Sequence, residues 1–328
     1  MLELSLAVGN YDRTRAIFDG RVAIEGCRVH AVALEPEEAS HRAFRHQDFD
    51  VSELSLGSHM VATARGTSTY VGIPAFVSRL FRHSAIYIRT DRGISGPADL
   101  RGKVIGVPEY QTTANVWVRG FLQHEHGVHP RDIKWRRGGV ETPGRGERSP
   151  LTLPPDIELL QIPGDRTLSD MLERGEIDGI VGARAPSCFT RGAPNVDRLF
   201  PDYPAVEEAY FRKTGIFPIM HIVGIRRTLL EQHPWLAASV YKAFIQSKEL
   251  CMRALGEIAQ LSTSQPWSVA EHERLQRVMG KDYWSYGAEA NRNGLDMLAR
   301  FAFEQGMTSR QFAIDELFAH STLDHSKI

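Results

Sequence analysis

Short apolar runs alternate with amphipathic stretches along the first two thirds of the chain. The apolar runs are bounded by Gly, Pro, Asn or Asp and predict strands at 4–8, 29–34, 49–55, 71–76, 83–89, 104–107, 157–162 and 177–181. The stretches with helical spacing predict helices at 13–18, from 35 onward, at 114–126 and at 168–174. Strands that alternate with helices are typical of an α/β protein with a parallel sheet.

The pattern changes after residue 222. Residues 228–252, 268–279 and 288–305 have helical spacing, so the last third is predicted to be mostly helical. Residues 138–156 are rich in Gly, Pro, Arg and Ser and predict a surface loop. Because ligands of parallel α/β sheets bind at the carboxyl ends of strands, we expect the loops at 9–14, 52–58 and 76–83 to face one cleft.

Two stretches of the sequence are alike. Residues 82–89 and 220–226 each place a histidine, His83 or His221, at the start of an apolar segment that ends in arginine. If both are crossover strands of a two-lobed protein, two imidazoles and several guanidiniums meet at one interlobe cleft. That arrangement predicts an anion-binding site that contains a titratable group.

Composition narrows the class of protein. The chain has 328 residues, enough for about two domains, with 42% hydrophobic and 24% charged residues and a net charge of −1. This balance gives no support to nucleic acid or a membrane as a partner. The three cysteines are widely spaced and form no CxxC pair, which favours free thiols in a reducing compartment. The N-terminal segment has no signal-peptide pattern and no apolar run is long enough to span a bilayer, so we expect a cytoplasmic location.

The sequence resembles the type II periplasmic-binding-protein fold. The resemblance rests on Asp99-Leu100-Arg101-Gly102-Lys103 with the strand that follows it, on the helix-to-strand step at 175–179, and on residues 225–235. It implies an α/β, two-lobed fold with two crossover strands and a helical C-terminal region. The expected division is lobe 1 at 1–88 and 222–328 and lobe 2 at 89–221, with the ligand cleft between them.

A more specific resemblance is to the 4,5-dihydroxyphthalate decarboxylase family. Five segments carry it in order along the chain, at 6–14, 49–55, 76–84, 106–114 and 218–221. The resemblance implies a lyase of aromatic and phthalate degradation that releases CO2 from 4,5-dihydroxyphthalate and gives 3,4-dihydroxybenzoate. The partner is then a small aromatic carboxylate, and the helical C-terminal third offers an interface for a homo-oligomer.

An ortho-dicarboxylate needs cationic and hydrogen-bonding partners, because it presents two adjacent negative charges. The residues predicted to bind it lie in or beside the expected cleft loops and are Arg13, Ser55, Arg79, Arg82, Tyr110, Gln111, Thr113 and Trp117. The threonines at 112 and 113 also suit a helix start whose free amides favour an anion. The alternative for the arginines is solvation or pairing with nearby carboxylates, and for Trp117 a place in the core.

Decarboxylation from an aromatic ring needs an acid near one ring carbon and an acceptor near a phenol. His83, His221 and Glu53 are the predicted catalytic residues, because imidazole titrates near neutrality and a carboxylate can orient it or accept a proton. The alternatives are structural histidines and a salt bridge at Glu53. The sequence has no nucleotide-binding motif, and we expect no cofactor. A divalent metal held by the same three residues is the alternative.

Two other functions fit the same fold. A solute-binding protein for an aromatic or sulfonated anion would bind without reacting and feed a transporter. A ligand-sensing domain of a regulator would need a DNA-binding module, which the sequence does not show.

Overall fold

A computed structural model describes residues 1–147 and 151–324, which form two compact units. Unit 1 comprises Met1–Arg79, Ile219–Asp296 and the segment from Phe312 onward, and unit 2 comprises Leu80–Pro218 and Met297–Gln311. The chain therefore leaves unit 1 at the end of residue 79, not 88, and returns at 219, not 222. Residues 297–311, expected in lobe 1, belong to unit 2.

Unit 1 is built on a five-stranded sheet in the order β2-β1-β3-β11-β4. Its strands are β1 (Leu2–Val8), β2 (Cys27–Ala33), β3 (Val51–Ser55), β4 (Tyr70–Arg79) and β11 (Ile219–Arg226). β1 pairs in parallel with β2 and β3, as the alternating pattern predicts, whereas β11 is antiparallel to both β3 and β4. Only β11 runs against the others, and it is the strand that enters the sheet from unit 2.

The helices of unit 1 are mostly those expected, with two differences. They are α1 (Arg15–Phe18), α2 (Pro36–His46), α3 (Leu56–Ala64), α8 (Arg227–Gln232), α9 (Leu236–Leu255) and α10 (Ser268–Met279). The stretch at 228–252, expected to be largely helical, consists of two helices, because Pro234 lacks the backbone N–H that helix continuation needs and separates α8 from α9. The sequence also missed α3, whose first six residues are all buried and so show no amphipathic period.

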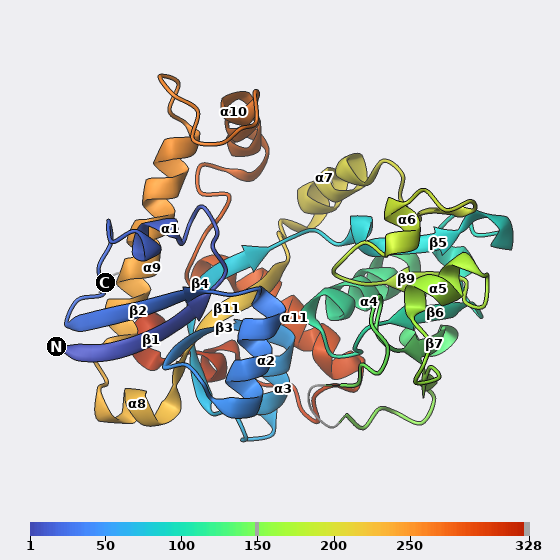
Figure 1. The fold of residues 1–328 in the computed structure, drawn as a ribbon, viewed down its shortest axis with the longest axis horizontal. Coiled ribbons are helices and arrows are strands. Elements are labelled where there is room, and N and C mark those ends of the chain that lie inside the picture. The colour runs from blue at the N-terminus through green and yellow to red at the C-terminus, as the bar shows by residue number, and fades with distance from the viewer. Residues whose placement is uncertain (148–150, 325–328) are drawn as a thin grey trace. The chain divides into compact units, whose positions relative to one another are not determined.

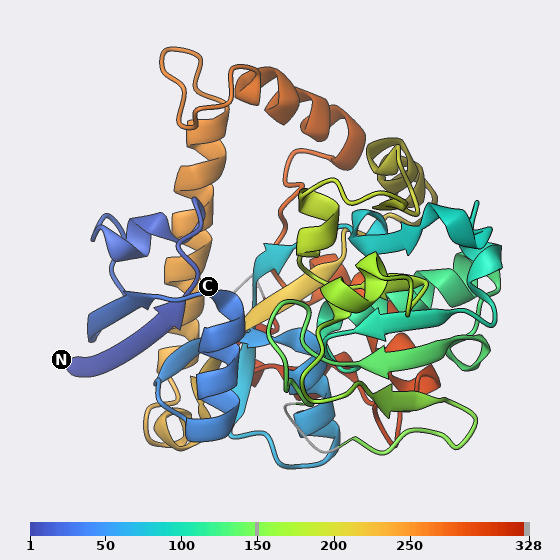
Figure 2. The ribbon, with the colours of Figure 1, turned by 45° about the vertical axis from the view of Figure 1, so that its right-hand side comes forward.

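Three of these helices pack against strands of the sheet. α2 contacts β1 and β3, α3 contacts β3 and β11, and α9 contacts β4 and α1. Figures 1 and 2 both show α10 following α9 at the end of α9 that points away from α8. The coil after α10 then returns to β4, where the Gly287 amide donates to the Pro74 carbonyl.

Unit 2 has a six-stranded sheet in the order β10-β5-β9-β6-β7-β8. Its strands are β5 (Ile86–Arg89), β6 (Val104–Val107), β7 (Lys134–Arg137), β8 (Leu159–Gln161), β9 (Gly179–Val181) and β10 (Val196–Arg198). Its helices are α4 (Thr113–His126), α5 (Leu168–Glu173), α6 (Ser187–Thr190) and α7 (Tyr203–Thr214), with most of α11 (Arg292–Glu304). The four consecutive strands β9, β6, β7 and β8 are parallel to one another, whereas β5 is antiparallel to both of its neighbours, β9 and β10.

The predicted strand at 83–89 is partly wrong. Residues His83–Ala85 form a 3₁₀ turn, and β5 begins only at Ile86, where it first pairs with Val181 of β9. The likeness between residues 82–89 and 220–226 therefore does not extend to structure, because His221 lies within a strand and His83 does not. Part of the predicted loop at 138–156, residues 148–150, lies outside the described residues.

The core of unit 2 joins α4 to α11. The Trp117 indole meets the Phe301 ring edge to face, with centroids 5.7 Å apart. The same phenyl ring lies over Gly120, where an added Cβ would come within 2.0 Å of it, so α4 needs glycine at this contact.

No helix in the described part of the chain is both long enough and apolar enough to cross a bilayer.

Candidate functional site

Glu53 and His221 form a buried carboxylate–imidazole pair in unit 1. β3 and β11 are antiparallel neighbours, and their register places His221 opposite Ser55 and Glu53 opposite Val223. The two side chains are therefore diagonal neighbours on one face of the sheet. His221 Nδ1 lies 2.6 Å from Glu53 Oε1. Two of the three predicted catalytic residues thus meet, although they are far apart in sequence.

The Glu53 carboxylate is enclosed by donors. Its side chain has 0% exposure, the Tyr11 hydroxyl donates to Oε1 at 2.8 Å, and the Gly9 amide donates to Oε2 at 2.8 Å. Burial alone would raise the pKa of Glu53, but the hydrogen bond and charge of His221, with the Gly9 and Tyr11 donors, hold that pKa below its ordinary value. The carboxylate is therefore ionised at neutral pH.

This pairing fixes the tautomer of His221. An ionised carboxylate can only accept a hydrogen bond, so Nδ1 carries the proton that lies between the two groups. Nε2 is then the nitrogen that can give or take a proton. The His221 side chain is 21% exposed, in contrast to Glu53. The geometry is that of an acid–base group oriented by a buried carboxylate.

Tyr11 was not predicted as a site residue, yet it completes this arrangement. Thr14 holds the loop after β1 by donating from Oγ1 to the Gly9 carbonyl at 2.7 Å, and it accepts from the Tyr11 amide at 3.1 Å. A Cβ on Gly9 would lie 2.5 Å from the Tyr11 ring, so only glycine lets the ring reach Glu53. Tyr11 lies in segment 6–14, which carries the family resemblance, but only Arg13 of that segment was predicted as a site residue.

Two of the predicted carboxylate-binding arginines bind other parts of unit 1. Arg13 donates from Nε to the Val77 carbonyl at 2.7 Å and from Nη1 to Asp12 at 3.1 Å. Arg79 is buried and donates from Nη2 to the Ser285 carbonyl at 2.6 Å and to Asn291. Burial lowers the pKa of Arg79 to about 9. Both arginines therefore tie β4 to neighbouring segments.

Three of the predicted binding residues of unit 2, Tyr110, Gln111 and Thr113, lie at the start of α4. The Tyr110 amide donates to Glu147 Oε1 at 2.5 Å, and the Gln111 side-chain amide donates to Glu147 Oε2 at 3.0 Å. Thr113 is the first residue of α4 and is buried. These residues were predicted to donate to a substrate carboxylate, whereas in this structure the Tyr110 and Gln111 amides donate to the chain's own Glu147. Trp117 is in the core, which was the alternative for it.

His83 and Arg82 lie in a different setting from His221. The His83 ring is 3% exposed and stacks on Phe121 with centroids 4.2 Å apart and planes 16° apart, with Phe200 and Tyr210 also in contact. Arg82 is buried and donates from Nη1 to the Ala183 carbonyl at 3.4 Å. This is the environment of a packed aromatic histidine, so we base the mechanism on His221 alone.

The enclosure of His83 predicts acid-sensitive stability. Burial, with a smaller effect of His126, lowers the pKa of His83 from 6.5 to about 4. Between these values the unfolded chain binds a proton that the folded chain does not, so stability falls as the pH drops through this window, by about 3 kcal/mol in all. Denaturant unfolding at a series of pH values should show a shallower decline for His83→Phe than for the wild type. Parallel curves for the two proteins would contradict this expectation.

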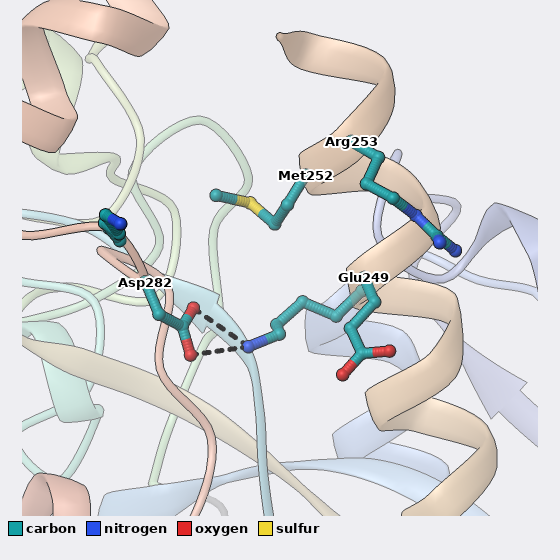
Figure 3. A pocket seen from close by; sticks show the side chains of 6 residues that line it. Glu249, Met252, Arg253 and Asp282 are labelled. Carbon is teal, nitrogen blue, oxygen red and sulfur yellow. Dashed lines mark hydrogen bonds and ion pairs between the residues drawn. The ribbon is translucent and has the colours of Figure 1, made fainter.

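Unit 1 also contains a hollow of about 360 Å³. It is lined by Lys248, Glu249, Met252, Arg253, Lys281 and Asp282 (Figure 3). Its buried ammonium, Lys248, is already paired with both Asp282 oxygens at 2.8 and 2.9 Å. None of the predicted site residues lines it. Nor does any group of three or more His, Cys, Asp or Glu side chains among residues 1–147 and 151–324 have an arrangement that could hold a metal.

The fold is that of two-unit α/β ligand-binding proteins. The periplasmic aliphatic sulphonate binding protein SsuA from Escherichia coli has a TM-score of 0.52 and 13% identity, with 98% of each chain covered. The ligand-binding component of an ABC-type import system from Staphylococcus aureus has a TM-score of 0.50 and 12% identity, with 100% of each chain covered. At these identities the likeness concerns the fold alone, and it confirms the predicted fold class. A scan of protein-family models finds no match.

The sequence defines the family more narrowly. The chain is 47% identical over 327 residues to a 4,5-dihydroxyphthalate decarboxylase of Comamonas testosteroni, which covers 100% of this chain and 99% of that protein. It is 53% identical over 211 residues to a 4,5-dihydroxyphthalate decarboxylase of Pseudomonas putida, over 64% of this chain and 82% of that one. The chain belongs to the 4,5-dihydroxyphthalate decarboxylase family, as its sequence motifs predict.

Proposed function

We propose that this protein decarboxylates 4,5-dihydroxyphthalate to 3,4-dihydroxybenzoate and CO2, with His221 as the group that moves the proton. Membership of the family supports the reaction, and the Glu53–His221 pair is the single observation that carries the mechanism. The buried, ionised Glu53 carboxylate holds Nδ1–H and so leaves Nε2 as the nitrogen that can pass a proton to the substrate.

Each turnover consumes one proton, which ends in the new C–H bond of the ring. His221 Nε2–H protonates the ring carbon that bears the leaving carboxylate, while the hydroxyl para to that carbon supplies electrons to the ring. The bond from the ring carbon to the carboxylate then breaks as CO2 leaves, and its electron pair restores the aromatic ring. The carboxylate is replaced by hydrogen, so atoms and electrons balance without an oxidant.

The hydroxyl side chains beside His221 are the proposed substrate donors of unit 1. Ser55 on β3 and Ser78 on β4 are both register partners of His221, one on each side of β11. Ser55 was among the predicted binding residues, whereas Ser78 was not. Arg82, Tyr110, Gln111 and Thr113 stay predictions for the substrate carboxylates.

The proposal is tested by incubating the purified protein with 4,5-dihydroxyphthalate in D2O. We expect CO2 release, 3,4-dihydroxybenzoate formation, and one deuterium at the ring position that carried the carboxylate. Tight binding without turnover would contradict the proposal and favour a solute-binding protein.

We also propose that no metal takes part, because the carboxylate that would hold one is occupied. Both Glu53 oxygens accept hydrogen bonds, from Tyr11 and His221 on Oε1 and from Gly9 on Oε2. The rate of CO2 release should therefore survive exhaustive chelation in the same assay. Loss of activity that returns on adding a divalent cation would overturn this part.

The proposed location is the cytoplasm, and its support is that Cys27, Cys188 and Cys251 are all free. Self-association through the helical C-terminal region stays a prediction.

A further inference from the structure

The Arg13 guanidinium lies between two aromatic rings. Its Cζ is 4.2 Å from the centre of the Tyr11 ring and 4.1 Å from the centre of the Trp284 ring. A cation held between two ring faces is attracted by both. The same guanidinium also donates to the Val77 carbonyl and to Asp12. Aromatic rings therefore cover both faces of the Arg13 guanidinium, and hydrogen bonds hold its N–H groups. The Arg13 side chain is only 14% exposed.

Trp284 is itself fixed to the edge strand of the sheet. Its indole Nε1 donates to the Phe76 carbonyl at 2.9 Å. The segment that carries it is attached to β4 at two further points, by the Gly287 amide on the Pro74 carbonyl and by Arg79 on the Ser285 carbonyl. The indole is thus a rigid surface for Arg13, because its own hydrogen bond and those of the neighbouring Ser285 and Gly287 attach this segment to β4.

The other end of this stack is the residue that contacts the catalytic pair. The Tyr11 ring lies on Arg13, and its hydroxyl donates to the same Glu53 oxygen that His221 Nδ1 contacts. A change in the position of the ring would move or break the Tyr11–Glu53 hydrogen bond. One continuous row of contacts therefore runs from β4 through Trp284, Arg13, Tyr11 and Glu53 to His221.

We infer that Trp284 and Arg13 are positioning residues, whose stack with Tyr11 sets the orientation of Glu53 and His221. The inference rests on the proposed role of His221, and it gives Arg13 a different task from the carboxylate binding predicted from the sequence. A misplacement of about 1 Å at a reacting group can lower a rate by about 100-fold, so a remote stack can matter for turnover.

The main test compares Trp284→Leu with Trp284→Phe. Leucine removes the ring that Arg13 lies on, so kcat should fall by about 10- to 100-fold while KM changes by less than about threefold, because substrate binding is not the interaction removed. Phenylalanine keeps a ring and should restore most of kcat. Arg13→Met removes the charge between the rings and should repeat the leucine result.

Two control variants separate positioning from stability. Trp267→Leu changes an indole that is 79% exposed and should leave kcat unchanged. Phe49→Leu removes another arginine–aromatic contact of unit 1, with Arg42, and should lower the unfolding midpoint with little effect on kcat. Equal losses of kcat in Phe49→Leu and Trp284→Leu would overturn the inference.

A spectroscopic measurement decides the matter even if the protein proves not to be a decarboxylase. The His221 Nδ1 proton, held by Glu53, should give a downfield resonance in ¹⁵N-histidine-labelled protein, identified by its absence from His221→Gln. In Trp284→Leu and Arg13→Met this signal should shift or exchange with water faster, and in Trp267→Leu it should not change. An unchanged signal in folded Trp284→Leu and Arg13→Met overturns the inference, whatever the assay of the wild type shows.

Discussion

Replacing His221 by alanine should lower the rate of CO2 release by about 100- to 10,000-fold, which is the usual contribution of a positioned acid–base group. The imidazole is the one group of the pair that is partly exposed, and its Nδ1 is held by Glu53 at 2.6 Å. Binding of the product 3,4-dihydroxybenzoate, measured by calorimetry, should be retained, because the role proposed for this side chain is to move a proton and not to bind the product.

The chain offers a matched control for this variant. His30 lies on β2 and contacts Glu3 at 2.7 Å, but both side chains are exposed. His30→Ala therefore removes a histidine–glutamate pair of similar length and should leave the rate unchanged. A rate for His221→Ala within about threefold of the wild type would remove this residue from the mechanism.

Replacing Glu53 by glutamine should lower both activity and stability. The wild-type carboxylate accepts from Gly9, Tyr11 and His221, whereas an amide of the same shape places its own N–H groups against one of these donors. Unmatched donors in a fully buried site cost about 3 kcal/mol, which denaturant unfolding would register as a lower midpoint. The rate of CO2 release should fall as well, because His221 loses the carboxylate that orients its ring.

The pH dependence of this effect has a definite sign. The pKa of Glu53 in the folded protein lies below its ordinary value, so its ionised form contributes stability above that ordinary value and loses it as the pH falls through the lower one. The difference in stability between the wild type and Glu53→Gln should therefore shrink in acid. Glu3→Gln, at the exposed pair, is the control and should leave the unfolding midpoint unchanged. A stability difference at Glu53 that is independent of pH would contradict the buried charge.

Local patterns predicted most of the α/β architecture and part of the site. The strand at 104–107 and the helix at 268–279 have the predicted bounds, because clear apolar periods and turn residues delimit them. The helix α3 escaped prediction because it is buried on nearly all sides. The antiparallel direction of β11 depends on where the chain returns from unit 2, and no local pattern encodes that.

The site shows the same limit of sequence reasoning. His221 and Glu53 were predicted individually from their residue types and neighbouring motifs, but their contact depends on the register of two strands that are distant in sequence. His83 occupies a similar sequence context, yet three aromatic rings enclose it, from α4, from α7 and from Phe200. Which histidine is enclosed and which is partly exposed follows from tertiary packing alone.

The insertion of β11 between β3 and β4 has a consequence for how the protein folds during synthesis. β3 and β4 leave the ribosome well before residues 219–226, and all of Leu80–Pro218 is made in between. Until β11 is synthesised, Glu53 has no contact with His221, and β3 and β4 lack the strand that lies between them. The sheet of unit 1 therefore stays incomplete. Such long-range pairing is slow and leaves strand edges exposed to other chains in the meantime. The nascent N-terminal segment therefore exposes unpaired strand edges while Leu80–Pro218 is being synthesised, which favours aggregation at that stage.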